Sequence, residues 1–368
     1  MSNYKLLIVG SFPKKDSKIY GGIARSCQIL IESEEFSRFQ IIKFDSSQSS
    51  SPTPHFLIRL YNALIRLVKF PIILLFHRPK VNLIFCSDGF SALEKGIMVY
   101  FSKLFNISVL IFPRAGELIN QSNNSSLFLG TIKYLFKKAD YFLCQGDEWK
   151  KFAIEKIKFN VNNTIIINNW SATNDLIKLE KSRSEPKVDK KINFLFSGWV
   201  IKEKGVMELL SAFKNLTNKG YNISLKIVGD GRLMKHSILF SKKYNLNNIS
   251  LTGWADRSEL IKHLEESDVF VLPSWQEGMP NSLIEALASG LPCIATSVGV
   301  IPNYLTNNQH ALIIKPRDVK NLEISMERLI LDPELRKKLS KNGHLLVKNV
   351  FLTNNSLKKL STILNQLI

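Results

Sequence analysis

The sequence has few cysteines, and they form no recognisable metal or disulfide framework. There are 4 among 368 residues, Cys27, Cys86, Cys144 and Cys293, and all are far apart. No C-x-x-C pair occurs, and no group of cysteines and histidines has zinc-finger spacing. We therefore predict reduced, partly buried thiols in a cytosolic protein, and no metal site.

Long uninterrupted apolar segments are also missing. The first apolar run, Leu6–Val9, is too short for a signal peptide, and no small-residue cleavage site follows it. Residues 55–80 are apolar overall, but cations interrupt them, which argues against a transmembrane span. We therefore expect a cytoplasmic protein.

Acidic residues are scarce relative to basic ones. The chain has 50 Lys and Arg against 31 Asp and Glu, a net charge of +19. Such an excess indicates anionic partners: nucleic acid, an anionic membrane surface or phosphorylated small molecules. Because the excess is spread over both halves and no concentrated basic footprint with aromatic platforms is found, we expect no nucleic-acid partner.

Residues 55–80 contain no acidic residue at all. Their polar side chains recur at helical spacing on one narrow stripe, made of His55, Arg59, Asn62, Arg66 and Lys69. Pro71 should kink or end this helix. Two interpretations stay open: a basic amphipathic helix at an anionic membrane surface, or a core helix whose polar stripe faces water.

Short apolar runs alternate with longer helical patterns along the chain, and the length suggests two domains. The predicted strands are Leu6–Val9, Ile41–Phe44, Val81–Cys86, Val109–Phe112, Tyr141–Cys144, Thr164–Ile167, Asn193–Ser197, Ser224–Val228, Ile249–Thr252, Val269–Leu272, Pro292–Ala295 and Ala311–Ile314. Continuous apolar runs are typical of parallel strands covered on both faces. The pattern predicts an α/β protein with two Rossmann-like, doubly wound domains that face a cleft.

The polar segment Leu176–Lys191 has no apolar period and contains Pro186, so we place the interdomain linker there. This gives domains at residues 1–180 and 190–350. Residues 351–368 form a closing helix, with an apolar face that includes Leu357, Leu360 and Leu364, and this helix is expected to cross back to the first domain.

Two carboxylates follow the predicted strand Val269–Leu272. Glu277 lies in a turn-rich loop, and Glu285 lies in the first turn of a helix expected to open at Ser282 and close at Gly290. Unpaired amides of a first helical turn form an anion site, and carboxylates pair well with sugar hydroxyls. The alternatives are a solvated loop carboxylate for Glu277 and, favoured by the spacing alone, a capping box for Ser282-x-x-Glu285.

Two further strand ends carry glycines. Gly198 follows one strand, and Lys204 then stands at the start of a helix near Gly205, where it suits a phosphate clamp. Gly229-Asp230-Gly231 ends the next strand. Each signal alone is common in α/β proteins, and a solvated Lys204 is the alternative.

Taken in order, these residues resemble the retaining glycosyltransferase family 4, enzymes of GT-B architecture that include glycogen-synthase-like and capsular polysaccharide types. The similarity is close over residues 190–305. It includes Gly198, Lys204-Gly205, Gly229-Asp230-Gly231, Gly253-Trp254, the pair Glu277 and Glu285, and Val298-Gly299-Val300-Ile301-Pro302. The first half is similar more loosely, through its opening strand and Gly21-Gly22.

The resemblance implies catalytic or donor-binding roles for named residues. Lys204 would hold the donor diphosphate, Glu277 the sugar hydroxyls and Glu285 the ribose hydroxyls. The remaining donor-binding positions would be Gly21, Gly22, Gly198, Gly229, Met279, Pro280, Asn281 and Ser282. The family needs no metal or other cofactor.

The implied reaction is sugar transfer, with retention, from a UDP- or GDP-sugar. The acceptor would be a lipid-linked or oligosaccharide precursor of capsule or lipopolysaccharide, which places a peripheral enzyme at the inner face of the cytoplasmic membrane.

The chain departs from the family pattern at three places. Trp199 stands where an arginine is usual, so that Lys202 or Arg232 is left to substitute. Gly299-Val300 replaces the usual glycine-glutamate. The first-domain position for histidine or aspartate holds Arg114 and Glu117, which either act there or form surface ion pairs.

These departures keep other classes open. One is another GT-B enzyme, either an inverting transferase or a sugar-nucleotide epimerase. The other is a protein of this fold that binds membrane or nucleic acid without catalysis.

Overall fold

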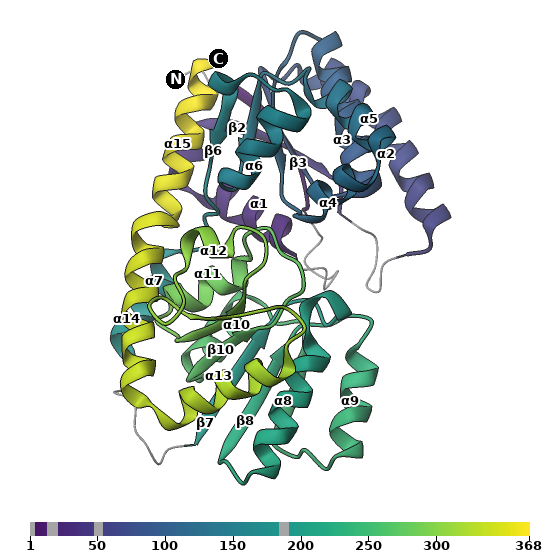
Figure 1. Ribbon diagram of the computed structural model, residues 1–368. Helices are drawn as coiled ribbons and strands as arrows, with labels where there is room; N and C mark the ends of the chain where they lie inside the picture. Colours follow the sequence, from purple (N-terminus) through teal and green to yellow (C-terminus); the bar gives the residue numbers. More distant parts are fainter. Residues whose placement is uncertain (1–3, 13–20, 48–53, 184–190) are drawn as a thin grey trace. The chain divides into compact units, whose positions relative to one another are not determined.

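The computed structural model describes residues 4–12, 21–47, 54–183 and 191–368, and its contacts divide the chain into two compact units (Figure 1). Unit 1 comprises Met1–Trp170 and Asn354–Ile368, and unit 2 comprises Ser171–Thr353. The chain therefore passes from unit 1 to unit 2 and returns.

Unit 1 is built on a parallel sheet of six strands in the order β2-β1-β3-β4-β5-β6. The strands are β1 (Tyr4–Gly10), β2 (Phe39–Asp45), β3 (Val81–Cys86), β4 (Ser108–Pro113), β5 (Tyr141–Cys144) and β6 (Thr164–Ile166). The helices are α1 (Gly22–Glu32), α2 (Phe56–His77), α3 (Gly89–Leu104), α4 (Glu117–Asn124), α5 (Ser126–Phe136), α6 (Asp147–Phe152) and α15 (Thr353–Gln366). Short helical turns cover Glu34–Phe36, Ala153–Ile157 and Val161–Asn163.

The last helix belongs to the core of unit 1. Leu357, Leu360 and Leu364 of α15 are fully buried in one cluster with strand residues such as Leu6 and Leu83. Figure 1 shows this helix in yellow at the end of the chain. The apolar face of a C-terminal segment thus completes a core that the first 170 residues leave open.

Helix α2 has 22 residues and continues through Pro71 to His77, so of the two predicted effects of the proline, a kink or an end, the helix end does not occur. In the described part of the chain, no helix combines the length and the apolar character that a membrane span requires. Helix α3 packs on β3 and β4 and contacts both α2 and α5.

Unit 2 contains a second parallel sheet of six strands in the order β12-β11-β10-β7-β8-β9. The strands are β7 (Ile192–Ser197), β8 (Ile223–Val228), β9 (Ile249–Gly253), β10 (Val269–Leu272), β11 (Cys293–Thr296) and β12 (Leu312–Ile314). The helices are α7 (Asn174–Leu179), α8 (Val206–Asn218), α9 (Met234–Lys243), α10 (Arg257–Glu265), α11 (Asn281–Ala288), α12 (Ile301–Tyr304), α13 (Val319–Leu331) and α14 (Pro333–Val350). Short helical turns cover Glu180–Ser182 and Lys202–Lys204.

All of the predicted strands are confirmed, as is the α/β class with two Rossmann-like sheets. In unit 2, β7, β8 and β9 follow one another toward one edge of the sheet, and β10 then pairs with the other side of β7. This is the dinucleotide-binding strand order, and its direction reverses between β7 and β10. In unit 1 the reversal lies between β1 and β3.

The boundary between the units differs from the prediction. Residues 171–183 belong to unit 2, so the predicted domain end at 180 and the linker start at Leu176 are too late. Leu176 is fully buried, and the Arg183 guanidinium donates to the carbonyls of Ser289, Ser267 and Leu264 at 2.5, 2.9 and 2.8 Å. Because the segment is polar in composition, these contacts could not be predicted from the sequence. Pro186 lies outside the described residues.

Candidate active site

Two loops of unit 2 meet where its strand order reverses. The turn Lys202–Lys204 follows β7, and the loop 273–280 follows β10, the strand next to β7. The carboxyl ends of parallel strands at such a reversal are the usual ligand site of open α/β sheets. The topology therefore brings the loops of Lys204 and Glu277 to the same end of the sheet.

Backbone contacts hold these two loops together. The Trp275 amide donates to the Glu203 carbonyl at 2.8 Å. Gly205 adopts φ +68°, and a Cβ there would lie 2.0 Å from the Pro273 carbonyl oxygen. Glycine is required because any side chain would push the loops apart.

The side chains of Lys204 and Glu277 form an ion pair between the loops. Lys204 Nζ lies 2.5 Å from Glu277 Oε1, and the Ser274 hydroxyl donates to the same oxygen at 2.7 Å. The Glu277 side chain is 8% exposed and that of Lys204 is 21% exposed. Both contacts use Oε1, and no described residue donates to Oε2. The second carboxylate oxygen therefore has no donor among the described residues.

The predicted capping box of Ser282 and Glu285 does not match the start of its helix. Helix α11 begins at Asn281, one residue before the predicted start, with Pro280 as N-cap and no side-chain capping bond. The Glu285 carboxylate instead lies 3.6 Å from Arg257 Nη1 and is 7% exposed. The capping-box interpretation is therefore wrong, and Glu285 is a buried carboxylate with a cationic neighbour.

Arg257 was not predicted from the sequence. Its guanidinium also donates to Asp175 at 2.8 Å and to the Thr173 hydroxyl at 2.6 Å. Burial acts to raise the pKa of Asp175, but the hydrogen bonds and charge of Thr173 and Arg257 hold this pKa below its usual value. Because Arg257 lies 84 residues after Thr173 and 82 residues after Asp175, no local pattern marks the cluster.

The start of α11 and the loop after β11 complete this end of the sheet. Met279 is buried, and Asn281 and Ser282 form the first helical turn, whose amides point toward the loop. Gly299 adopts φ +55°, and a Cβ there would lie 2.2 Å from the Glu277 carbonyl oxygen. The β11 loop therefore supports the Glu277 loop directly.

The remaining glycines lie at the ends of β7 and β8. The Gly198 amide donates to the Val228 carbonyl at 2.9 Å, and the Gly229 amide donates to the Gly253 carbonyl at 2.7 Å. Trp199, at the family's arginine position, packs edge-on against Trp254 with ring centres 4.7 Å apart.

The cations considered as substitutes for the missing arginine lie at different places. Lys202 Nζ lies 5.2 Å from the ring centre of Trp275, and Arg232 is exposed. Arg317 was not predicted, because no motif includes it, and its guanidinium lies 4.3 Å from the same ring centre. Two cations therefore lie near the ring of Trp275, which is part of the loop that carries Glu277.

In unit 1, Arg114 follows β4 and is not part of a surface ion pair. Its guanidinium lies 4.8, 5.1 and 6.0 Å from the ring centres of Phe112, Trp170 and Phe85, and it donates to the Ser26 hydroxyl at 2.8 Å. No carboxylate among the described residues pairs with it. Burial lowers the pKa of Arg114 to about 10. The group is thus a desolvated cation in an aromatic cage.

Three further residues of unit 1 were predicted to belong to the site: Glu117, Gly21 and Gly22. Glu117 is the first residue of α4 and accepts from Asn120 Nδ2 at 3.2 Å. Gly21 is the N-cap of α1 with φ −178°, an extended conformation that any residue adopts, and Gly22 begins that helix.

Comparisons with known structures identify the fold. The chain is similar to a sucrose-phosphate synthase from Thermosynechococcus elongatus, with a TM-score of 0.77, 17% identity and 99% of each chain covered. It is also similar to Anabaena Alr3699/HepE in complex with UDP-glucose, with a TM-score of 0.72, 13% identity, and 98% of this chain and 99% of that one covered. At these identities the match establishes the fold, which is GT-B.

Sequence comparisons match part of the chain to a family and most of it to a named glycosyltransferase. Residues 177–345 match the family Glycosyl transferases group 1. Over 325 residues the chain is 26% identical to the capsular polysaccharide biosynthesis glycosyltransferase CapM of Staphylococcus aureus, with 84% of this chain and 82% of CapM covered. It is 31% identical to the uncharacterized glycosyltransferase MJ1059 of Methanocaldococcus jannaschii, over 54% of this chain and 51% of that protein. The chain is therefore a glycosyltransferase, and its residues 177–345 match the group 1 model.

Proposed function

We propose that this glycosyltransferase moves a sugar, with retention of anomeric configuration, from a nucleotide sugar to a polysaccharide or glycolipid precursor at the inner face of the cytoplasmic membrane. The observation that carries the proposal is the pairing of Lys204 and Glu277 where the strand order of unit 2 reverses. An ammonium group beside a carboxylate with one open oxygen suits a ligand that has both phosphates and sugar hydroxyls.

Each donor-binding residue has a proposed role. The Lys204 ammonium has three N–H donors, of which one serves Glu277 and two remain for the donor diphosphate. The first-turn amides of α11, near Asn281 and Ser282, add partial positive charge at the same group. Glu277 Oε2 accepts from a hydroxyl of the transferred sugar, and Glu285, oriented by Arg257, accepts from the ribose.

The proposed reaction breaks the bond between the anomeric carbon and the β-phosphate oxygen. The acceptor oxygen forms its bond to the same carbon on the same face, and its proton passes to the departing phosphate. Lys204 and the α11 amides stabilise the negative charge that develops on the leaving diphosphate. The nucleotide sugar is a co-substrate, and no cofactor is required.

The choice of donor and acceptor follows the relatives. A UDP-Gal:alpha-D-GlcNAc-diphosphoundecaprenol alpha-1,3-galactosyltransferase of Escherichia coli is 33% identical over 128 residues, which are 34% of this chain and 32% of that protein. CapM acts in capsular polysaccharide biosynthesis, and HepE was crystallised with UDP-glucose. We therefore propose a UDP-sugar donor ahead of a GDP-sugar, and a lipid-linked or oligosaccharide acceptor.

Nucleotide binding gives a first test. We expect UDP or GDP to raise the Tm of the chain by a few degrees at saturating concentration, because a ligand that binds the native state stabilises it by mass action. Lys204→Met should lose most of this shift, whereas Lys235→Met on the exposed side of α9 should keep it. A donor screen against lipid-linked acceptors, read by mass spectrometry and by NMR of the anomeric proton, then tests transfer. Inversion would refute retention, and no binding of any nucleotide would refute the proposal.

Arg114 is proposed to hold an anionic group of a substrate in unit 1, with Gly21, Gly22 and Glu117 as further positions of that unit. A buried cation with no carboxylate partner carries a desolvation cost that an apolar residue of similar volume avoids. We therefore expect Arg114→Met to leave the Tm unchanged or higher while transfer falls by at least about 10-fold. Parallel loss of Tm and activity would show instead that Arg114 is structural.

A further inference from the structure

Helix α2 leaves most of its apolar surface uncovered. Phe70 and Leu74 are its buried residues, out of 22. The exposed large apolar side chains, between 40% and 78% accessible, are Phe56, Leu57, Ile58, Leu60, Tyr61, Leu64, Val68, Ile72, Leu75 and Phe76. Isolated exposed apolar residues are ordinary, but a contiguous stripe along a whole helix marks an interaction surface.

The orientation of α2 is fixed by a polar contact on its inner side. Arg66 binds the Glu94 carboxylate through two bonds of 2.6 and 3.1 Å, and Lys95 donates to the same carboxylate at 2.9 Å. Glu94 and Lys95 are 5% and 3% exposed. Burial acts to raise the pKa of Glu94, but Lys95 and Arg66 outweigh it and hold this pKa below its usual value.

This contact bears on the two interpretations of residues 55–80. Arg66, from the predicted polar stripe, binds Glu94 of α3, whereas Arg59 and Lys69 of the same stripe are exposed, so the stripe lies only partly in water. Rotating α2 to bury its apolar side would leave the Glu94 and Lys95 charges without Arg66, at a large cost in stability. The apolar side is therefore held outward.

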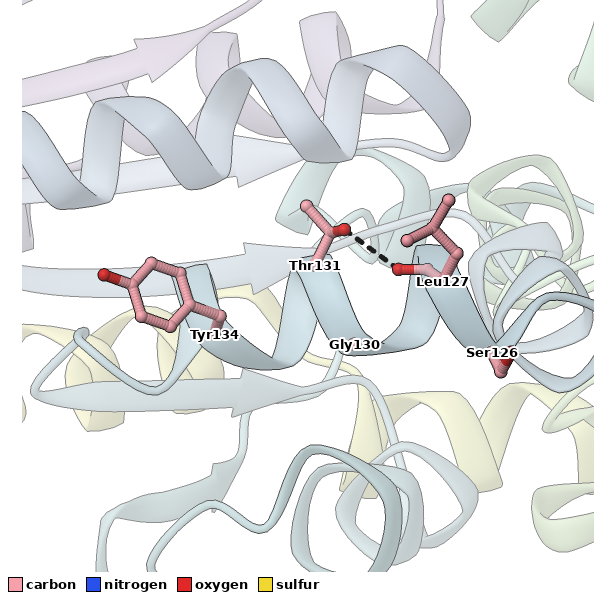
Figure 2. A pocket seen from close by; sticks show the side chains of 5 residues that line it. All are labelled: Ser126, Leu127, Gly130, Thr131 and Tyr134. Carbon is pink, nitrogen blue, oxygen red and sulfur yellow. Dashed lines mark hydrogen bonds between the residues drawn. The ribbon is translucent and has the colours of Figure 1, made fainter.

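The adjoining helices expose similar chemistry. Phe56 of α2 packs on Phe90 of α3, with ring centres 5.3 Å apart, and Phe90 is itself 57% exposed. Along α5 runs an open depression of about 530 Å³, lined by Ser126, Leu127, Gly130, Thr131 and Tyr134 (Figure 2). Lys138 Nζ lies 5.0 Å from the ring centre of Tyr134. Apolar side chains beside lysines are thus a feature of this helical layer.

The positive charge of residues 55–80 indicates what kind of partner binds the exposed surface of α2. Residues 55–80 contain no Asp or Glu, and Arg59, Lys69, Arg78 and Lys80 are exposed. A second copy of the chain packed symmetrically on α2 would bring cations against cations. An anionic bilayer supplies both the negative charge and an apolar layer for the outward stripe.

We propose that α2 docks this protein on an anionic lipid bilayer, with Leu64, Val68 and neighbouring apolar side chains among the acyl chains and the exposed cations at the headgroups. The helix lies in the interface and does not span it. This deepens the proposed function, on which it rests for the choice of membrane, by naming the surface that meets lipid.

Vesicle flotation of the full chain tests the proposal. We expect binding to phosphatidylglycerol-containing vesicles, much weaker binding to pure phosphatidylcholine, and loss of binding as salt rises. Since the native cysteines are buried, Val68→Cys offers an accessible thiol for an environment-sensitive fluorophore. Its emission should shift to the blue on vesicle addition, whereas the same probe on Leu239→Cys, 64% exposed on α9, should not respond.

Matched charge variants identify the surface. At about fivefold per cation, R59E/K69E should weaken vesicle binding by at least about 25-fold. K235E/K242E on α9 changes the net charge equally and should have little effect. Equal losses in both variants, an unresponsive probe at Val68→Cys, or a dimer that L64Q/V68Q dissociates would overturn the proposal.

Vesicle binding and sugar transfer can be tested separately. Vesicle binding without sugar transfer would leave the docking surface in place and remove the proposed function. Transfer to a short-chain, water-soluble acceptor by a protein that binds no vesicles would do the reverse.

Discussion

Glu277→Gln should lower kcat/KM for sugar transfer by at least about 100-fold, which is about 2.7 kcal/mol of transition-state stabilisation. Glutamine has the same shape but no charge, and its side chain has one oxygen where glutamate has two. If that oxygen accepts from Lys204 and Ser274, an NH2 group replaces the carboxylate oxygen that we assign to the sugar. The charge-assisted bond to the sugar hydroxyl is then lost while the fold is kept.

Glu203→Gln is the matched control for this experiment. Glu203 immediately precedes Lys204 and is exposed, so its removal changes the net charge equally without touching the ion pair. Its transfer rate should stay within about twofold of the parent value. Steady-state kinetics and a thermal melt of each variant are the measurements. A Glu277→Gln enzyme with near-normal kcat/KM would contradict the assignment of this carboxylate to the donor.

The strands were predictable because their signal is local. Val81–Cys86, Tyr141–Cys144 and Val269–Leu272 have the predicted bounds, since a parallel strand buried on both faces is a continuous apolar run. The meeting of Lys204 and Glu277 was predictable for a related reason, because residues that follow neighbouring parallel strands gather at the same end of a sheet.

The orientation of α2 was not predictable from its period. Spacing places Arg59, Asn62 and Arg66 on one stripe, but it does not say whether water or another helix faces that stripe. The answer depends on Glu94, which lies 28 residues after Arg66 and on a different helix. A period defines the faces of a helix, and the tertiary partner decides which face is inside.

The capping box failed for the same kind of reason. Ser282 and Glu285 have the right separation, yet the helix begins at Asn281, so that Ser282 is not the N-cap. The Glu285 carboxylate instead lies near Arg257, from another helix. The surroundings of Arg114 also come from separate elements. Its aromatic neighbours are Phe85 of β3, Phe112 of β4 and Trp170, the last residue in the first segment of unit 1.

The geometry of the ion pair depends on backbone contacts at glycines. The turn that carries Lys204 meets the β10 loop at Gly205, and the β11 loop meets the Glu277 carbonyl at Gly299. Both glycines have positive φ and both have a carbonyl oxygen where a Cβ would be. The separation of Lys204 and Glu277 is therefore set by the main chain, before their side chains adopt any rotamer.

Gly205→Ala should consequently damage both the fold and the site of unit 2. Alanine at φ +68° costs about 1–2 kcal/mol, and its Cβ would stand 2.0 Å from the Pro273 oxygen, so the two loops must separate. We expect a loss of unfolding free energy of about 3 kcal/mol or more and a fall in transfer of over about 100-fold. Denaturant titration and initial rates measure the two effects.

Gly220→Ala separates the steric clash from the backbone strain. Gly220 follows α8 with φ +85°, so alanine there meets the same conformational penalty, but no atom lies within 4 Å of its Cβ. This variant should lose only about 1 kcal/mol of stability and keep its activity, because nothing is displaced. Equal behaviour of the two variants would mean that the contact at Pro273 does not hold the Lys204 and Glu277 loops in register. The proposed donor site would then lack its structural basis.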